Sequence, residues 1–217
     1  MTIKSGREPL VVLGTGAHAK VVIEVLEAAG QYDILGVCSG DPAAPETVCG
    51  YENLGTFNIL DKLRDQGLKF AAIGVGGWTD NSFREEVFNI AKSKGFELVR
   101  AIHPSAIIAS NVMIGEGSMI GSGVIIMTEA IIGRNSIISS AALISHETII
   151  SDHVLISGAA KIGAQVNIDE GAVVAFSATV NSRVTVGSKA LVASGAVAVK
   201  NVKPGTRVFG IPAVERS

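Results

Sequence analysis

Two adjacent side chains in the second half of the sequence, His146 and Glu147, could carry out proton transfer. Imidazole titrates near neutral pH, so it can take a proton from an amine or hydroxyl that attacks an acyl group. A neighbouring carboxylate can hold the ring in one tautomer. The simplest alternative is an ordinary exposed histidine, so the pair indicates catalysis only in a suitable structural setting.

A glycine-rich segment near the N-terminus follows a short apolar run and is typical of a strand-to-helix turn. Glycines let a phosphate approach the backbone, and the N-terminus of a helix favours an anion. The third glycine of a dinucleotide fingerprint is replaced by Ala19, and no acidic residue ends the second strand to hold a ribose. We therefore predict a nucleotide phosphate site here, with a turn needed only for packing and an NAD site as alternatives. The predicted residues are Gly14, Thr15, Gly16, Ala17 and His18.

Other chemistries find less support in the sequence. The four His and two Cys residues show no zinc-ligand spacing, so no metal site is predicted. A Ser-His-Asp hydrolase is not expected either, because the chain has no G-x-S-x-G motif. His153 is predicted to be an ordinary surface residue, and Trp78 and Phe176 could either line a pocket or fill one.

The elements that must position the glycine-rich turn alternate between strands and helices. Apolar runs predict strands at 10–13, 34–38, 70–75 and 99–102, and apolar residues at helical spacing predict helices at 17–29, 59–66 and 82–93. Gly30 is the expected end of the first helix. Residues 39–57, rich in Pro, Gly and acidic residues, are expected to form an irregular loop. The first 102 residues are thus predicted to be an α/β, Rossmann-like domain with a small parallel sheet.

The period changes after Ile102, and this second half must position His146. Every sixth residue is Ile or Val at fifteen consecutive positions: 108, 114, 120, 126, 132, 138, 144, 150, 156, 162, 168, 174, 180, 186 and 192. A period of six is neither helix nor simple strand. It predicts one flat side of a three-sided coil, a parallel β-helix over residues 103–217, with its Ile and Val side chains stacked inward.

The ladder also places the candidate base. Three sides make an 18-residue coil, so Ile126, Ile144, Ile162 and Val180 should form one inward column. His146 follows Ile144 by two residues and should therefore lie at a corner, on the outside of the prism. Flat sides can pack on neighbouring prisms, and an external base needs a facing wall, so we expect a homotrimer.

Composition excludes several classes of function. The formal net charge of −2 gives no field that would concentrate nucleic acid or anionic lipid. The N-terminal residues contain charges but no apolar core typical of a signal peptide, and no apolar run reaches the length of a membrane span. Cys38 and Cys49 do not form a disulfide framework, which favours the cytoplasm.

The chain resembles the left-handed β-helix acyltransferases with hexapeptide repeats. It is most similar to the branch that contains sialic-acid O-acetyltransferases and nucleotide-linked 4-amino-sugar N-acetyltransferases. The resemblance rests on Gly14–Lys20, His103-Pro104-Ser105-Ala106, Ile144-Ser145-His146-Glu147 and Gly210-Ile211-Pro212-Ala213. It implies a left-handed coil, catalytic His146 and Glu147, a sugar nucleotide in the N-terminal domain and acetyl-CoA between the β-helices of a trimer.

The sequence departs from the family pattern at three places. Cys38 and Ser39 stand where the family has an acidic pair near the uracil, Ser139 replaces an Asn, and Leu155 replaces a second His. No residue is assigned to acetyl-CoA. Three functions follow from the resemblance: N-acetylation of a nucleotide-linked amino sugar, O-acetylation of a sialic-acid-type sugar, or a catalytically weak nucleotide-sugar-binding assembly protein. We predict the first; the lost His and Asn equivalents favour the third, but the His146-Glu147 pair argues against it.

Overall fold

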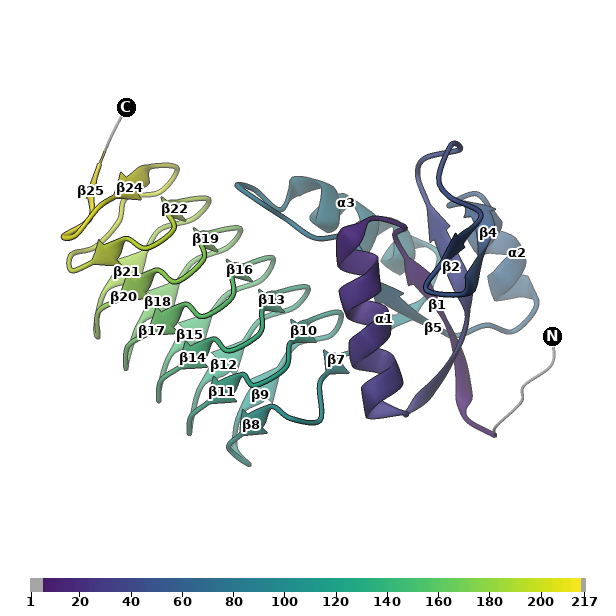
Figure 1. The fold of residues 1–217 in the computed structure, drawn as a ribbon, viewed down its shortest axis with the longest axis horizontal. Coiled ribbons are helices and arrows are strands. Elements are labelled where there is room, and N and C mark those ends of the chain that lie inside the picture. Colours follow the sequence, from purple (N-terminus) through teal and green to yellow (C-terminus); the bar gives the residue numbers. More distant parts are fainter. Residues whose placement is uncertain (1–5, 216–217) are drawn as a thin grey trace.

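The computed structural model describes residues 6–215, which form two halves that lie next to each other along the longest axis of the molecule (Figure 1). The N-terminal half contains a six-stranded sheet in the order β3-β4-β2-β1-β5-β6, parallel except for the β3–β4 pair. Its elements are β1 (Glu8–Leu13), α1 (Ala17–Ala29), β2 (Tyr32–Ser39), β3 (Thr47–Val48), β4 (Tyr51–Thr56), α2 (Ile59–Asp65), β5 (Phe70–Ile73), α3 (Ser82–Ser93) and β6 (Glu97–Leu98).

Alternate residues of β1 face opposite sides of this sheet and pack against different helices. Leu10 and Val12 belong to an apolar cluster with α1, whereas Val11 and Leu13 belong to a cluster with α2 and α3. Helix α1 ends at Gly30, as predicted: this residue has a left-handed backbone with φ 62°, and its N–H donates to Leu26 O at 2.9 Å.

The expectation of an irregular loop over residues 39–57 is wrong for its second half. Strand β3 turns antiparallel onto β4, and β4 pairs in parallel with β2. Loop composition hid these strands because β4 lies close to the edge of the sheet and four of its residues are only half-buried.

The second half is a left-handed parallel β-helix with three faces. Face 1 consists of β7 (Ala101–Ile102), β10 (Met119–Ile120), β13 (Ile137–Ile138), β16 (Leu155–Ile156), β19 (Val173–Val174), β22 (Leu191–Val192), β24 (Arg207–Phe209) and β25 (Val214–Glu215). Face 2 consists of β8 (Ile107–Ile108), β11 (Ile125–Ile126), β14 (Leu143–Ile144), β17 (Lys161–Ile162), β20 (Thr179–Val180) and β23 (Val197–Ala198). Face 3 consists of β9 (Met113–Ile114), β12 (Ile131–Ile132), β15 (Ile149–Ile150), β18 (Asn167–Ile168) and β21 (Thr185–Val186).

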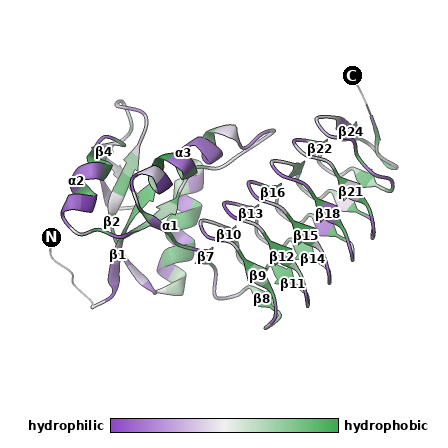
Figure 2. Ribbon diagram, turned by 180° about the vertical axis from the view of Figure 1, so that it is seen from behind, coloured by the Kyte–Doolittle hydropathy of each residue, from purple (hydrophilic) through white to green (hydrophobic). Residues whose placement is uncertain are grey.

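The predicted six-residue ladder is confirmed. Ile126, Ile144, Ile162 and Val180 are paired across successive strands of face 2 and are almost completely buried. Each buried Ile or Val contributes about 1.5–3 kcal/mol relative to an exposed side chain. Most strands of the β-helix are accordingly coloured as hydrophobic in Figure 2, with β18 as a visible exception, whereas α2 is largely hydrophilic.

The corners of the β-helix share one backbone feature. Every sixth residue from Gly117 to Gly195 has a positive φ, including non-glycine residues such as Glu147 and His153. A left-handed residue turns the chain sharply between two flat sides. Side chains at one corner therefore recur every 18 residues and stack in columns along the prism.

Face 1 packs on the N-terminal half. Its strands place one side chain each on the outer surface, and these belong to the same apolar cluster as Val22 and Ile23 of α1. The five buried side chains are Met119, Ile137, Leu155, Val173 and Leu191. The residues predicted as a strand at 99–102 are divided, because Ala101 and Ile102 form β7 and pair with β10 of the β-helix.

A buried arginine reinforces this junction. Arg84 of α3 donates to Ile73 O and Val75 O at the end of β5 and just after it. It also donates to Gly117 O and Asn135 O at a corner of the β-helix, and the four distances are 2.5–3.1 Å. It is only 1% exposed, and it forms no ion pair with any residue in the range 6–215. Four carbonyl groups from both halves thus satisfy one guanidinium group.

No helix within residues 6–215 has the length and apolar character needed to cross a membrane. The outer limits of the two predicted domains, residues 1 and 217, lie outside the described residues.

Candidate functional site

The glycine-rich turn lines a cavity of about 260 Å³ at the carboxyl edge of the sheet. All five predicted residues line it, and Gly14 and Gly74 directly follow the ends of β1 and β5. In an open parallel sheet, the crevice beyond the carboxyl ends of the strands is where ligands bind. Here β2 and β5 flank β1 on opposite sides, so the crevice lies where the strand order reverses.

The two glycines of the turn have different roles. Gly14 has φ 137°, and a Cβ atom there would lie 2.7 Å from the backbone of Gly74, so close packing of the two strand ends requires glycine. A Cβ atom on Gly16 would meet no atom of the described residues within 4 Å. Gly16 also precedes the first turn of α1 without a side-chain cap, which leaves backbone N–H groups available to an anion.

His18 lies in the wall of this cavity as a neutral imidazole. Burial, and then the positive charge of Arg84, lower its pKa to about 3. Its Nε2 atom is buried and has no hydrogen-bond partner among residues 6–215. A buried nitrogen without a partner is unfavourable, so a polar group of a ligand in the cavity would stabilise the arrangement.

Sequence reasoning missed the residues of other segments that complete the cavity. Asp41 follows β2, Phe57 precedes α2, and Phe83 lies in the first turn of α3. Asp41 and Phe57 could have been suspected only from their place after strand ends. Cys38, one of the departures from the family pattern, is fully buried, and burial raises the pKa of its thiol to about 12. Ser39 lies at the cavity, where its Oγ accepts a hydrogen bond from Asp41 N at 2.9 Å.

His146 and Glu147 lie where the six-residue period predicts, at the corner between faces 2 and 3. His146 Nδ1 is 3.1 Å from Glu147 Oε2, and both side chains are 44% exposed. Hydrogen bonds from Gln165 first, and from His146 second, lower the pKa of the Glu147 carboxyl, so it is ionised at neutral pH. An ionised carboxylate on Nδ1 favours the tautomer whose outward Nε2 has a free lone pair.

The structure does not bring the two predicted groups together within one chain. The cavity is lined only by the N-terminal half, which packs on face 1. His146 lies at the corner opposite that face, since faces 2 and 3 meet there. Ser139 and Leu155 lie in segments of face 1 or next to it, and Leu155 is buried.

The prediction that His153 is a surface residue is wrong. It is 7% exposed, because Asn81 Nδ2 donates to its backbone oxygen at 2.7 Å and the ring of Phe88 meets its imidazole edge-on at 5.5 Å. Asn135 Nδ2 lies 2.9 Å from its Nδ1. All these contacts are made by residues far from His153 in the sequence, so the local sequence gives no sign of them.

His153 also belongs to a group that could be mistaken for a metal site. Possible ligand atoms of Glu85, His153 and Glu170 lie within 4.8 Å of one another. Asn135 Nδ2 also donates to Arg84 O at 3.3 Å, which orients the amide so that His153 Nδ1 is an acceptor. Neutral His153 then carries its proton on Nε2, so it offers a hydrogen-bond donor to the carboxylates and no lone pair to a cation.

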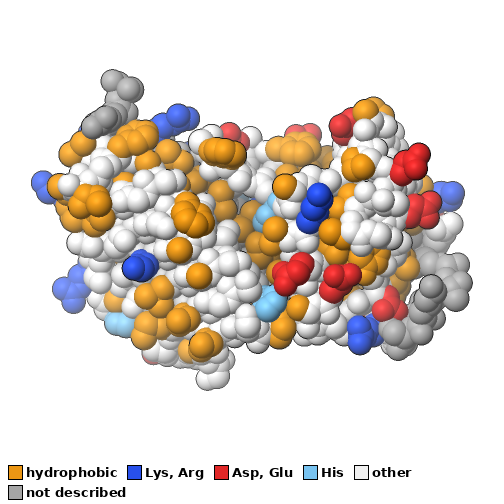
Figure 3. Space-filling view, viewed as in Figure 1, with side chains coloured by type: hydrophobic (Ala, Val, Ile, Leu, Met, Phe, Trp, Pro, Cys, Tyr) orange, Lys and Arg blue, Asp and Glu red, His pale blue; other side chains and the backbone are white. Residues whose placement is uncertain are grey.

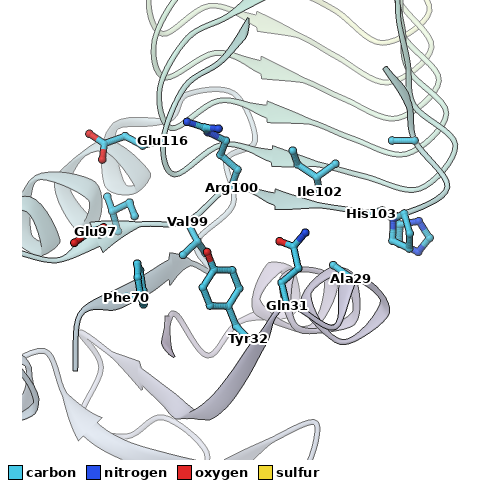
Figure 4. A pocket seen from close by; sticks show the side chains of 13 residues that line it. Ala29, Gln31, Tyr32, Phe70, Glu97, Val99, Arg100, Ile102, His103 and Glu116 are labelled. Carbon is cyan, nitrogen blue, oxygen red and sulfur yellow. The ribbon is translucent and has the colours of Figure 1, made fainter. Parts of the chain in front are cut away.

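A larger cleft of about 650 Å³ lies between the two halves at the opposite edge of the sheet (Figure 4). Tyr32 and Phe70, at the starts of β2 and β5, lie on one side, and Arg100 and His103 lie on the side of the β-helix. None of the predicted site residues lines this cleft. We therefore place the candidate nucleotide site in the smaller cavity at the carboxyl edge.

Comparison with known proteins gives the following relations. Residues 9–91 match the family model of the PglD N-terminal domain. A mutant of perosamine N-acetyltransferase from Caulobacter crescentus, in complex with CoA and GDP-perosamine, is 31% identical, with both chains covered completely and a TM-score of 0.92. The acetyltransferase domain of PglB from Neisseria gonorrhoeae, in complex with acetyl coenzyme A, is 28% identical, with 97% of this chain and 100% of that chain covered and a TM-score of 0.88. WeeI from Acinetobacter baumannii, 22% identical over 96% of this chain and 100% of that chain with a TM-score of 0.85, shares the fold. No curated protein sequence gave a significant match.

Proposed function

Since the chain belongs to the hexapeptide-repeat acetyltransferase family, we propose that it transfers the acetyl group of acetyl-CoA to the amino group of a nucleotide-linked amino sugar. One observation carries the proposal. A single chain combines a glycine-lined cavity at a strand edge with an external His–Glu pair on a β-helix, in the same full-length architecture as a perosamine N-acetyltransferase. The sugar nucleotide would occupy the cavity, with its phosphates near Gly16 and the first turn of α1.

In this proposal His146 is the general base. The acceptor nitrogen attacks the thioester carbonyl, and His146 Nε2 takes the proton that the nitrogen loses. The carbon–sulfur bond then breaks, and the CoA sulfur leaves with a proton returned by His146. Glu147, hydrogen-bonded to Nδ1, stabilises the imidazolium formed in between.

We propose a homotrimer as the active form, because one chain does not bring its cavity to its own His146. Faces 2 and 3, which the N-terminal half leaves open, expose apolar side chains near the His146 corner, among them Met127 and Ile149 at 41% and 45%. Exposed hydrophobic side chains are scattered over the β-helix in Figure 3, whereas the acidic side chains visible there lie mostly over the N-terminal half. A neighbouring chain packed on these faces would cover the apolar side chains and could bring its sugar nucleotide to His146.

We also propose the cytoplasm as the location of the enzyme. Cys38 and Cys49 are both free thiols, and Cys49 is exposed. An exposed thiol is compatible with a reducing compartment.

The activity is tested with the purified chain, acetyl-CoA and a panel of acceptors. The panel contains nucleotide-linked amino sugars with different bases and, as hydroxyl acceptors, sialic-acid-type sugars. We expect release of free thiol and a product heavier by one acetyl group only with an amino sugar. Turnover of the hydroxyl acceptors alone would assign O-acetylation instead, and turnover of none would favour the assembly protein.

The shared site is tested by mixing two inactive variants, His146→Ala and Gly16→Trp. Their mixed trimers contain interfaces at which an intact cavity of one chain meets an intact His146 of another. We expect part of the activity to return on mixing and refolding. No recovery, in trimers proven to be mixed by mass spectrometry, would place the complete site within one chain.

A further inference from the structure

The corner that carries His146 also carries a column of polar side chains on the following coils. Glu147, Gln165 and Arg183 are spaced by 18 residues, and each has the positive φ of its corner, 57°, 57° and 65°. The repeat therefore stacks these three side chains along one edge of the prism. All three are exposed within the chain and lie beside the faces left open by the N-terminal half.

Hydrogen bonds connect this column to His146. Glu147 Oε2, which is 3.1 Å from His146 Nδ1, accepts a hydrogen bond from Gln165 Nε2 at 2.8 Å. Gln165 Oε1 in turn accepts a hydrogen bond from Arg183 Nε at 3.0 Å. The four side chains form one continuous series, which we call the His146 ladder.

The direction of the ladder follows from the chemistry of its last member. An arginine only donates hydrogen bonds, so Gln165 must face Arg183 with its carbonyl oxygen. This leaves the Gln165 NH₂ group for the carboxylate of Glu147. Without Arg183 the amide could rotate and place its oxygen against the carboxylate, where two acceptors repel each other. Arg183, which lies two coils away from His146, thus determines the orientation of the Gln165 amide against Glu147.

The ladder affects the base through a single oxygen. Glu147 Oε2 accepts a hydrogen bond from the Gln165 amide and also contacts Nδ1 of the His146 imidazole. The hydrogen bond from Gln165 is also the largest cause of the lowered pKa of Glu147. A fixed, ionised carboxylate on Nδ1 keeps the proton of neutral His146 on that nitrogen and leaves Nε2 free to act as a base.

We propose that Gln165 and Arg183 are positioning residues for the His146–Glu147 pair, which act by holding the Glu147 carboxylate on Nδ1 of the catalytic imidazole. This inference rests on the proposed function of His146 as the base. It assigns a role in catalysis to two residues that neither touch the reacting atoms nor lie on the same coil as His146.

A matched control exists at a neighbouring corner. Arg134 and Asp152 are also 18 residues apart and are joined by hydrogen bonds at 2.6 and 2.8 Å. This pair lies on the corner between faces 3 and 1, away from His146. Arg134→Met therefore removes a comparable contact between coils without affecting the His146 ladder.

The kinetic test is a double-mutant cycle in the full-length enzyme. We expect Gln165→Met to lower kcat by about 3- to 10-fold with little change in KM, and Arg183→Met to have a smaller effect in the same direction. In a Glu147→Ala background, Gln165→Met should lower kcat no further, because its effect passes through the carboxylate. Arg183→Lys should restore part of the activity that Arg183→Met loses, and Arg134→Met should leave kcat unchanged.

Three kinetic results would overturn the inference. They are an unchanged kcat in Gln165→Met, equal losses of kcat in the parent and Glu147→Ala backgrounds, and a loss of kcat in Arg134→Met equal to that in Gln165→Met.

A second measurement keeps the inference testable if no acceptor is turned over. Two-bond nitrogen–proton NMR spectra report the tautomer of each imidazole, and His146→Ala identifies the signals of His146 by their disappearance. We expect mainly the Nδ1-protonated tautomer in the parent and an increased share of the Nε2-protonated tautomer in Gln165→Met. Equal tautomer populations in both would overturn the ladder, whereas missing turnover with the expected NMR change would count only against the proposed reaction.

Discussion

His146 and His153 lie at neighbouring corners of the same β-helix but in opposite surroundings. His146 has a side chain that is 44% exposed and paired with Glu147, whereas His153 is 7% exposed and lies under the N-terminal half. The repeat builds both corners with the same kind of left-handed turn. The difference comes from the elements that pack from outside, since Asn81, Arg84 and Phe88 all approach one corner and none approaches the other.

This difference shows how one regular framework acquires both a reactive and a structural histidine. At the covered corner, hydrogen bonds to backbone oxygens hold the two halves together. At the open corner, the side chains are hydrogen-bonded to one another along the prism and remain available to a substrate. The open corner should therefore govern turnover, and the covered corner should govern stability.

The largest expected effect is on turnover at the open corner. General base catalysis typically contributes about 10²–10⁴-fold, so His146→Ala should lower kcat by about that factor while the affinity for acetyl-CoA changes little. Steady-state kinetics and calorimetry would measure the two quantities. The matched variant at the covered corner, His153→Ala, should keep kcat close to that of the parent. Comparable losses of kcat in both variants would contradict the idea that only the open corner governs turnover.

The next effect is on stability at the covered corner. Arg84→Met leaves buried carbonyl groups without donors, and each such group costs about 1–3 kcal/mol, partly offset by removal of a buried charge. We expect a loss of about 3 kcal/mol in the free energy of unfolding, measured by urea denaturation at fixed protein concentration.

Lys92→Met is the control for this change. It removes the exposed ion pair that α3 makes with Glu116 at 2.9 Å, and we expect a loss below about 1 kcal/mol. Equal losses of unfolding free energy in the two variants would mean that the buried contacts of Arg84 stabilise the protein no more than an exposed ion pair does.

A third effect concerns pH and sets His18 apart from the exposed His146. Burial and Arg84 lower the pKa of folded His18 to about 3, whereas an unfolded histidine titrates near about 6.5. As the pH falls, the unfolded chain therefore binds a proton at His18 before the folded chain does. The contribution of neutral His18 to the free energy of unfolding is present above a pH of about 6.5 and is lost as the pH falls toward about 3.

At pH 5 the expected loss from His18 is about 2 kcal/mol in the free energy of unfolding. Urea denaturation at pH 7 and pH 5 would measure it, with His18→Gln as the variant without the titrating group. If the free energy of unfolding depended on pH as steeply in His18→Gln as in the parent, the effect would belong to other titrating groups.

The smallest effect is expected within the His146–Glu147 pair itself. Glu147→Gln keeps a hydrogen-bond acceptor near Nδ1 but removes the charge that stabilises the imidazolium, so we expect kcat to fall by about 10-fold or less. The comparison with His146→Ala under the same assay gives the ratio of the two losses. A loss as large as that of His146→Ala would assign Glu147 a more direct part in proton transfer.

The local pattern of the sequence was sufficient for the framework of the molecule. Fifteen consecutive hits at a six-residue period predicted the β-helix and its inward columns, because each side of the coil repeats the same burial. The same period placed His146 at a corner. The glycine-rich turn and the helix 17–29 were likewise predicted, since strand ends, glycines and helical periodicity are local signals.

Only the tertiary structure decided what covers each corner and what completes each site. The burial of His153, the four carbonyl groups around Arg84, the strand β4 and the contribution of Asp41 to the cavity all depend on segments far apart in the sequence. Periodicity records which side of a chain faces inward within its own coil. It contains no information on which outer surface another part of the chain will cover. Here that covering determines that His153 is buried while His146 stays exposed.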